Sequence, residues 1–270
     1  MSDHFAGKVA VLTGAGGAIV GEIAKTLAAK GVRVAIWDLS EEAAAAKAEE
    51  IRSLGGTSLA VQCDAISRPS AEGALAQTVE AFGTVDFLVN GAGGGHPDTT
   101  TSPDLEFFDI KPEALRFVMD LNYTTTVIPS QVVGRVFAAN GAGSVVNITS
   151  IGGGLPLSRA LSYSNGKAAA DSFTRWLAVH MAQTYSPAIR VNAVAPGFMI
   201  TNQNRFLLFD EKTQELTDRG QTVIGNVPMA RFGEPKEIAG AAVWLLSDTA
   251  TFVTGAVIPV DGGFSAFCGV

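Results

Sequence analysis

The chain has 270 residues, of which 47% are hydrophobic and 17% are charged. This composition can supply a sizeable buried core and excludes a disordered chain. Its 26 acidic residues outnumber the 19 basic ones and give a net charge of −7. That sign argues against nucleic acid or an anionic membrane surface as a partner.

The two cysteines, Cys63 and Cys268, stand far apart in the sequence and form no CxxC pair, which is typical of a reduced compartment. Residues 1–8 lack the pattern of a secretion signal, and no apolar run reaches the ~18 residues of a membrane span. The three histidines have no ligand-like spacing. We therefore expect a cytoplasmic protein without a bound metal.

Short β-branched runs alternate with Ala- and Leu-rich stretches along the chain, the pattern of βα units around a parallel sheet. The predicted strands cover residues 9–13, 32–37, 58–62, 85–90, 144–149, 189–194 and 256–260. The predicted helices cover residues 19–30, 41–54, 71–82, 113–139, 162–185 and 235–246. We expect one α/β domain over residues 1–270, with a Rossmann-type, doubly wound, mostly parallel seven-stranded sheet and helices on both faces.

Two segments, residues 91–112 and 196–232, are longer than usual connections. Both leave the carboxyl ends of strands, where open α/β sheets bind ligands, so we expect them to form the walls of a substrate site. The apolar run at 206–209 favours a lid or a subunit contact over the alternative of an apolar substrate tunnel. Residues 264–270 carry two phenylalanines and are expected to dock on a neighbouring subunit.

A glycine-rich turn, TGAGGA at residues 13–18, follows the first predicted strand. Free N–H groups and a helix dipole meet at such a turn, which suits a pyrophosphate, although a tight turn without a ligand has the same residues. The second strand is followed by Asp38, which can accept hydrogen bonds from both adenosine ribose hydroxyls and would repel a 2′-phosphate. NAD is therefore favoured over NADP. Asp38 could instead cap the following helix, a role that Ser40 could also fill.

Two further strand ends carry candidate cofactor contacts. Asp64 follows the third strand and is placed to reach the adenine edge, and NGAG at 90–93 ends the fourth strand with a flexible backbone beside the cofactor. Each feature is equally compatible with ordinary turn chemistry.

Tyr163 and Lys167 lie four residues apart, so they project from one face of a long predicted helix. Because the ordinary pKa of tyrosine is ~10, a neighbouring cation that favours the phenolate would bring this pKa closer to neutral pH. Ser150 follows the fifth strand and could hydrogen-bond a substrate oxygen, and Asn122, in the middle of the preceding helix, could hold a water. Each has an ordinary structural explanation when taken singly; together they predict acid–base catalysis.

This set of residues resembles the short-chain dehydrogenase/reductase family over essentially the whole chain, from Gly14 to the Asp-Gly-Gly at 261–263. The resemblance implies a homotetrameric oxidoreductase that transfers hydride between NAD(P) and an alcohol or ketone. The catalytic residues that it implies are Asn122, Ser150, Tyr163 and Lys167. The cofactor-binding residues that it implies are Gly14, Gly16, Gly17, Ala18, Ile19, Asp38, Asp64, Ala65, Asn90, Gly91, Ala92, Tyr163, Lys167, Pro196, Gly197 and Thr201.

The glycine turn departs from the pattern of this family. Ala18 and Val20 stand where the family has glycines, and Gly21 is displaced by one position. Because the backbone must approach the pyrophosphate closely, the methyl of Ala18 is tolerable only if its φ is negative. We expect Val20 to pack toward the sheet.

Several segments look like the D-mannonate oxidoreductase (fructuronate reductase) subgroup, some of whose relatives are called gluconate 5-dehydrogenase. They include GAGGGHP at 91–97, NQNR at 202–205 and PVDGGFSAF at 259–267. A sugar acid needs hydrogen-bonding side chains and a fixed cation, and arginine binds carboxylate in two parallel bonds. The candidate substrate residues are His96, Arg159, Asn204 and Arg205. The alternative for each arginine is a surface ion pair, and for His96 a turn cap.

Two other functions remain open. A reductase of apolar or carrier-bound ketones would need an apolar pocket or a basic docking patch, which the net charge and the polar residues 202–205 disfavour. A dinucleotide-sensing protein without catalysis would be expected to have lost catalytic residues, whereas all four are present.

Overall fold

The computed structural model describes residues 4–155, 157–201, 205–210 and 212–269. Seven strands form one sheet in the order β3-β2-β1-β4-β5-β6-β7, and every pairing is parallel. The strands are β1 (Val9–Thr13), β2 (Arg33–Asp38), β3 (Thr57–Gln62), β4 (Phe87–Asn90), β5 (Gly143–Ile148), β6 (Ile189–Pro196) and β7 (Val257–Val260). The prediction of a doubly wound α/β sheet is confirmed, with parallel pairing throughout.

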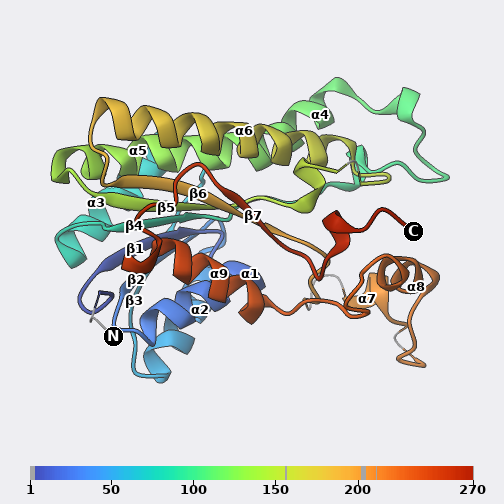
Figure 1. The fold of residues 1–270 in the computed structure, drawn as a ribbon, viewed down its shortest axis with the longest axis horizontal. Helices are drawn as coiled ribbons and strands as arrows, with labels where there is room; N and C mark the ends of the chain where they lie inside the picture. Colours follow the sequence, from blue (N-terminus) through green and yellow to red (C-terminus); the bar gives the residue numbers. More distant parts are fainter. Residues whose placement is uncertain (1–3, 156, 202–204, 211, 270) are drawn as a thin grey trace.

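Helices cover both faces of the sheet (Figure 1). One face carries α1 (Ala18–Ala28), α2 (Glu41–Ser53) and α9 (Pro235–Leu246), and the other carries α3 (Arg68–Phe82), α5 (Thr125–Asn140) and α6 (Leu161–Thr184). Alternate strand residues divide between the two cores. Leu12 and Ile36 pack with α1 and α9, whereas Val11 and Trp37 pack with α3, α5 and α6. Because every residue of β1 and β4 is buried, these central strands are almost continuous apolar runs in the sequence.

Capping residues set where several helices begin. The Ser67 side chain accepts a hydrogen bond from the Ser70 N–H, so α3 begins at Arg68, three residues before the predicted start. Pro235 opens α9, where a missing N–H is tolerated, and Glu234 and Glu237 form a capping box around it.

The predicted continuous helix over residues 113–139 is wrong in one respect. A π-helical turn, η3 (Asp120–Thr124), separates α4 (Pro112–Met119) from α5. π turns inside α-helices redirect side chains and are frequent at functional sites. Asn122 lies in this turn rather than in an ordinary helix, and it is fully buried.

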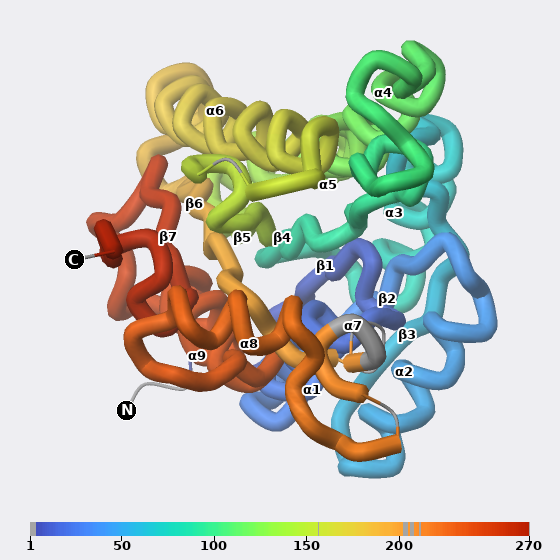
Figure 2. Tube along the Cα trace, turned by 90° about the vertical axis from the view of Figure 1, so that its right-hand side faces the viewer, coloured from blue at the N-terminus to red at the C-terminus, as the bar shows by residue number. Residues whose placement is uncertain are grey.

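The two long segments frame the edge of the sheet at which the strands end, the edge that faces the viewer in Figure 2. The first contains the short 3₁₀ turns η1 (Pro97–Thr99) and η2 (Phe107–Asp109), and the second contains α7 (Arg205–Leu208) and α8 (Asp218–Gly225). In Figure 2, α4 lies on the α6 side of this edge, and α7 and α8 lie on the α1 and α9 side. The two segments thus stand on opposite sides of the strand ends.

The second segment has a small core of its own, formed by Leu208, Val223, Val227 and Phe232. Phe264 packs against this core and lies 5.2 Å from Phe198 between ring centres. Phe264 therefore packs within its own chain, whereas Phe267 is 44% exposed. The docking of this end segment on a neighbouring subunit stays a prediction. In the 206–209 run, Leu208 is buried in the same core, and the side chains at 206 and 207 lie outside the described residues.

None of the helices in the described ranges combines the length and the apolar character that crossing a membrane requires.

Candidate active site

The glycine turn after β1 packs directly on the loop after β4. Gly14 has a φ of +65°, and a Cβ at this position would lie 2.8 Å from Ala92 Cα. A side chain is therefore excluded by both the backbone conformation and the available space. Thr13 Oγ1 accepts hydrogen bonds from the N–H groups of Gly91 (3.1 Å) and Ala92 (3.4 Å). The two loops therefore pack together as one continuous surface at the carboxyl edge of the sheet.

Helix α1 begins directly after this turn. Gly17 is its N-cap, and no side chain of the described residues caps its first N–H groups. Ala18 is the first helical residue and has a negative φ, the condition under which its methyl group is tolerated. Val20 is buried in the α1 core, as expected, and a Cβ on Gly91 would lie 2.1 Å from Val20 Cγ2. Val20, which stands where the family has a glycine, thus fills space beside the sheet. The first N–H groups of α1 have no side-chain cap among the described residues.

Asp38 stands beside the glycine turn at the end of β2. Its Oδ2 accepts a hydrogen bond from the Gly16 N–H at 2.9 Å, and its Oδ1 accepts one from the Ser40 N–H at 3.0 Å. The residue that caps α2 is Ser40, whose Oγ accepts from the Ala43 N–H at 3.1 Å. The helix-cap alternative for Asp38 is therefore wrong, and its carboxylate lies directly beside the glycine turn.

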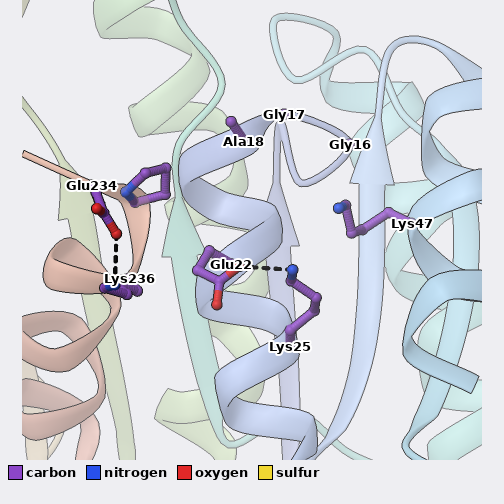
Figure 3. A pocket seen from close by; sticks show the side chains of 9 residues that line it. Gly16, Gly17, Ala18, Glu22, Lys25, Lys47, Glu234 and Lys236 are labelled. Atoms are coloured by element: carbon purple, nitrogen blue, oxygen red, sulfur yellow. Dashed lines mark ion pairs between the residues drawn. The ribbon is translucent and has the colours of Figure 1, made fainter. Parts of the chain in front are cut away.

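An open pocket of about 530 Å³ runs from the glycine turn along the outer face of α1 (Figure 3). It is lined by Gly16, Gly17, Ala18, Glu22, Lys25, Lys47, Glu234, Pro235 and Lys236. Its three lysines are all ion-paired, for example Lys25 with Glu22 at 2.7 Å and Lys236 with Glu234 at 2.6 Å. The sequence did not reveal this group because its members come from three helices. Their charges are already balanced, so they do not offset the repulsion of a 2′-phosphate by Asp38.

Other predicted cofactor residues also lie at strand ends, but two of their side chains are engaged elsewhere. Asn90 is buried, and its Nδ2 donates to Ser130 Oγ and Asn147 Oδ1, both at 2.9 Å. Asp64 Oδ1 accepts from the Ile66 N–H at 3.1 Å, which is the turn chemistry of the alternative interpretation. These two positions can therefore offer mainly their backbone or a remaining oxygen.

The last predicted cofactor residues lie where β6 ends. Pro196 is the final residue of the strand. Gly197 packs so closely on the chain after β7 that a Cβ would lie 2.6 Å from Asp261 Cα. The Thr201 carbonyl accepts from the Arg205 N–H at 3.0 Å, at the start of α7. Asn204, a candidate substrate residue, lies outside the described residues.

Ser150, Tyr163 and Lys167 come together where β5 ends against the start of α6. The Tyr163 hydroxyl hydrogen-bonds with Ser150, whose Oγ also accepts from the Gly152 N–H at 3.1 Å. Lys167 Nζ lies 5.8 Å from the centre of the Tyr163 ring and donates to the Ile148 carbonyl at 2.9 Å. As expected, Tyr163 and Lys167 share one face of the helix.

The π turn places Asn122 beside this group. Its Nδ2 donates to the carbonyls of Gly94 (2.7 Å) and Val118 (2.9 Å), and its Oδ1 accepts from the Gly94 N–H at 3.1 Å. A Cβ on Gly93 would lie 2.8 Å from Asn122 Oδ1 and 3.1 Å from Lys167 Nζ. Both protons of the Asn122 amide are donated to backbone carbonyls. Asn122 thereby fixes the loop after β4 beside Lys167, and its expected role in holding a water stays a prediction.

Burial governs the protonation of the two central groups. It raises the pKa of Tyr163, and the hydrogen bond with Ser150 acts in the opposite direction. The net direction is opposite to the expected lowering, because burial is the larger effect on the Tyr163 pKa. Lys167 Nζ donates to the Ile148 carbonyl, and its own effect on the tyrosine pKa stays a prediction. Burial also lowers the pKa of Lys167 to about 8, against the opposing influence of Asp171.

Two of the candidate substrate residues have partners of their own. His96 Nδ1 accepts from the Asp98 N–H at 3.3 Å, so this histidine caps η1, the alternative that the sequence left open. The Arg205 guanidinium donates to Gln214 Oε1 at 3.0 Å and lies 4.8 Å from the centre of the Phe209 ring.

Arg159 lies in a different environment. It is exposed, has a φ of +69°, and lines a pocket of about 270 Å³ between the first long segment and the start of α6. Leu157 lines the same pocket. A Cβ on Gly152 would lie 2.9 Å from Leu157 Cδ1 and 3.4 Å from Ser150 Oγ. The pocket that holds Arg159 therefore adjoins the turn that carries Ser150.

Comparisons with known proteins agree with this geometry. A family model described as enoyl-(acyl carrier protein) reductase matches residues 14–265. An uncharacterized oxidoreductase of Bacillus subtilis, UxuB, is 38% identical over 100% of this chain and 99% of its own length. The 7alpha-hydroxysteroid dehydrogenase of Escherichia coli K12 is 34% identical over 95% of this chain and 94% of its own length. A Haemophilus influenza crystal structure, described as a candidate D-mannonate oxidoreductase with bound NAD, is 39% identical, has a TM-score of 0.91, and covers 98% of this chain and 97% of its own.

The chain therefore belongs to the short-chain dehydrogenase/reductase family and is an oxidoreductase. The family predicted from the sequence motifs is confirmed.

The close contact between Val20 and Gly91 gives a first prediction. Gly91→Ala should lower the free energy of unfolding by about 1–3 kcal/mol, because the added methyl overlaps Val20 Cγ2. In a Val20→Ala background the same substitution should lose much less, since the overlapping methyl is gone. Urea unfolding of the wild-type protein, the two single variants and the double variant measures the difference. An equal loss in both backgrounds would show that Val20 does not set the packing at Gly91.

Proposed function

We propose that this protein is an NAD-dependent oxidoreductase that interconverts a secondary alcohol and a ketone on a sugar acid, of the D-mannonate and D-fructuronate type. One observation carries the proposal: the hydrogen-bonded Tyr163 and Ser150 lie beside the buried Lys167 at the carboxyl edge of the sheet. The relative with bound NAD, described as a candidate D-mannonate oxidoreductase, supports both the cofactor and the substrate class.

The residues at the glycine turn fit a dinucleotide. The uncapped start of α1 and the side-chain-free Gly14 and Gly16 suit a pyrophosphate. The Asp38 carboxylate would accept hydrogen bonds from the adenosine ribose and repel a 2′-phosphate, which favours NAD over NADP. Lys167 would hold the nicotinamide ribose. When bound, the nicotinamide supplies the hydride in ketone reduction and accepts it in alcohol oxidation.

The side chains supply the proton transfer. In reduction, Tyr163 donates its proton to the ketone oxygen, and the Ser150 hydroxyl donates a hydrogen bond to the same oxygen. Because burial raises the pKa of Tyr163, the phenol is protonated at neutral pH and suited to act as the acid. Lys167 contributes a positive charge next to the developing phenolate. Asn122 positions the loop after β4, so that Gly93 and Gly94 line the site.

Tyr163→Phe tests this function. The substitution should reduce kcat by at least about 100-fold, the usual contribution of a general acid, while NADH binding measured by fluorescence stays intact. NADH and NADPH oxidation should be followed with D-fructuronate, a gluconate-derived ketone and a 3-oxoacyl carrier thioester.

Tyr185→Phe is the matched control, since this tyrosine lies at the other end of α6. Near wild-type turnover by Tyr163→Phe would remove Tyr163 from the proton transfer. A preference for the carrier thioester or for NADPH would contradict the proposed substrate class or cofactor.

We infer that Arg159 binds the carboxylate of the substrate. It lines the pocket that adjoins the turn after Ser150, and the other candidate arginine, Arg205, is engaged by Gln214 and Phe209. Thr101, Ser164 and Asn165 line the same pocket, and side chains of these types can hydrogen-bond the hydroxyl groups of a sugar acid. A guanidinium grips a carboxylate through two parallel hydrogen bonds.

Arg159→Met should therefore raise KM for the sugar acid by about 10-fold or more, the loss of one charge-assisted pair. Arg205→Met is the control and should change KM little. A neutral polyol ketone should lose nothing from Arg159→Met, because it lacks the carboxylate. A larger effect of Arg205→Met than of Arg159→Met would show that the substrate carboxylate binds at Arg205 on α7.

We further infer a homotetramer and a cytoplasmic location. On α6, the exposed Trp176 stacks on His180 at 4.8 Å, and the half-exposed Tyr185 lies edge-on to the same histidine. A row of aromatic rings open to water marks an interaction surface. Cys63 is a buried thiol outside any disulfide, which suits a reduced compartment.

Light scattering should give four times the mass of the chain, and Trp176→Glu should lower it. A monomer mass for the wild-type protein would contradict the tetramer, and an unchanged mass in the variant would place the interface elsewhere.

A further inference from the structure

The face of α6 that carries Tyr163 and Lys167 continues for two more turns. Asp171 and Arg175 follow at the same spacing of four residues, so all four side chains lie along one face of the helix. Lys167 and Asp171 are both buried, with 5% and 7% of their surfaces exposed, and Arg175 lies at the exposed end of the row. A buried carboxyl group thus lies one helical turn from the buried ammonium.

Asp171 also contacts the chain on both sides of Ser150. The Thr149 hydroxyl, which donates to the Val194 carbonyl at 3.4 Å, also acts on the Asp171 carboxyl group and lowers its pKa. A Cβ on Gly153 would lie 2.7 Å from Asp171 Oδ2. The same Cβ would lie 3.0 Å from the carbonyl oxygen of Lys167. The strand end and the 3₁₀ turn that carry Ser150 therefore close directly over Lys167 and Asp171.

The hydrogen bonds of Asp171 do not explain why a carboxylate is placed there. Its Oδ1 is buried and has no hydrogen-bond partner among the described residues. Burying an unsatisfied carboxyl oxygen is costly, and a smaller neutral side chain would avoid this cost. A compensating interaction must come from the charge itself.

We propose that Asp171 is a positioning residue that keeps Lys167 protonated in its buried site by placing a negative charge one helical turn away. The inference rests on the proposed function, because a role for Asp171 in keeping Lys167 charged matters only if the reaction requires the ammonium form of Lys167.

The protonation of both groups agrees with this role. Burial lowers the pKa of Lys167 to about 8, and the charge of Asp171 opposes this decrease. Burial raises the pKa of Asp171, and Thr149, Arg175 and Lys167 act in the opposite direction.

The other groups around Lys167 are neutral at pH 7. Tyr163 shares its helix face, β5 presents the Ile148 carbonyl, and η3 presents Asn122. Within the described part of the chain, Asp171 is therefore the charge that favours the ammonium form of Lys167.

Because the pKa of Lys167 is about 8, most molecules carry the ammonium form at pH 7. This form is lost as the pH rises through 8. Removing the charge of Asp171 lowers this pKa further. Activity that depends on the ammonium should then be lost at a lower pH.

The direct test titrates Lys167 in the full-length protein. The Cε resonance of ¹³C-labelled lysine is followed against pH, and the signal of Lys167 is assigned by its absence in Lys167→Gln. In Asp171→Asn the midpoint should fall by about 1 pH unit, as expected when an opposite charge one helical turn away is lost. Asp171→Glu should restore most of the wild-type midpoint. An unchanged midpoint in Asp171→Asn would overturn the proposal.

Two further substitutions guard the result. Thr149→Val removes the hydroxyl that stabilises the Asp171 carboxylate, so it should lower the Lys167 midpoint by a smaller amount even if Asp171→Asn does not fold; no change would count against the proposal. Glu72→Gln removes a negative charge on α3, where it pairs with Arg68 at 3.7 Å. This control should leave the midpoint where it is, and an equal shift would show that net charge alone moves it.

The pH profile of kcat/KM separates this inference from the proposed function. We expect its alkaline limb to move down together with the Lys167 midpoint in Asp171→Asn. If the midpoint moves and the limb does not, the pairing of Asp171 with Lys167 stands and the catalytic role of Lys167 is contradicted. If the limb moves and the midpoint does not, Asp171 acts by another route and the inference fails.

Discussion

An ammonium group buried at the carboxyl edge of a parallel sheet is the constraint on which this site depends. Lys167 is 5% exposed, and it replaces its lost hydration with the Ile148 carbonyl and the charge of Asp171. Removing a charge from water is expensive unless such partners are fixed in advance. The fold fixes them because β5 ends where α6 begins its second turn, so strand, helix and ammonium meet at one point.

Close packing by small residues makes this arrangement possible. A Cβ on Gly93 would lie 3.1 Å from Lys167 Nζ, and one on Gly166 would lie 2.7 Å from Asn122 Cβ. These contacts bring the loop after β4 and the π turn onto α6, and Asn122 then secures the loop through Gly94. The same principle operates at the other end of the site, where Gly14 lets the turn after β1 rest on Ala92. The residues proposed for proton transfer and those proposed for dinucleotide binding are thus two ends of one packed surface.

Much of the fold and part of the site could be predicted from sequence alone, because those features are local. Strands buried on both faces are apolar runs, and a spacing of four residues places Tyr163 and Lys167 on one helix face whatever the tertiary context. Asp38 and the glycine turn were recognisable for the same reason, since a turn between a strand and a helix has its own residue pattern.

The features that escaped prediction depend on contacts between distant segments. The π turn at Asn122 is held by Gly94, which is 28 residues away in the sequence. The direction of the Tyr163 pKa is set by burial, which the residues around it in the sequence do not reveal. The lysines along α1 and the small core around Leu208 likewise assemble from separate elements.

The most direct measurement is a crystal structure of the protein with NAD and a bound sugar acid. The account predicts that the reacting oxygen lies within hydrogen-bonding distance of both the Tyr163 and the Ser150 hydroxyls. It also predicts that Lys167 Nζ reaches the nicotinamide ribose and that the carboxylate faces Arg159. A complex in which the reacting oxygen binds away from both hydroxyls would contradict the account.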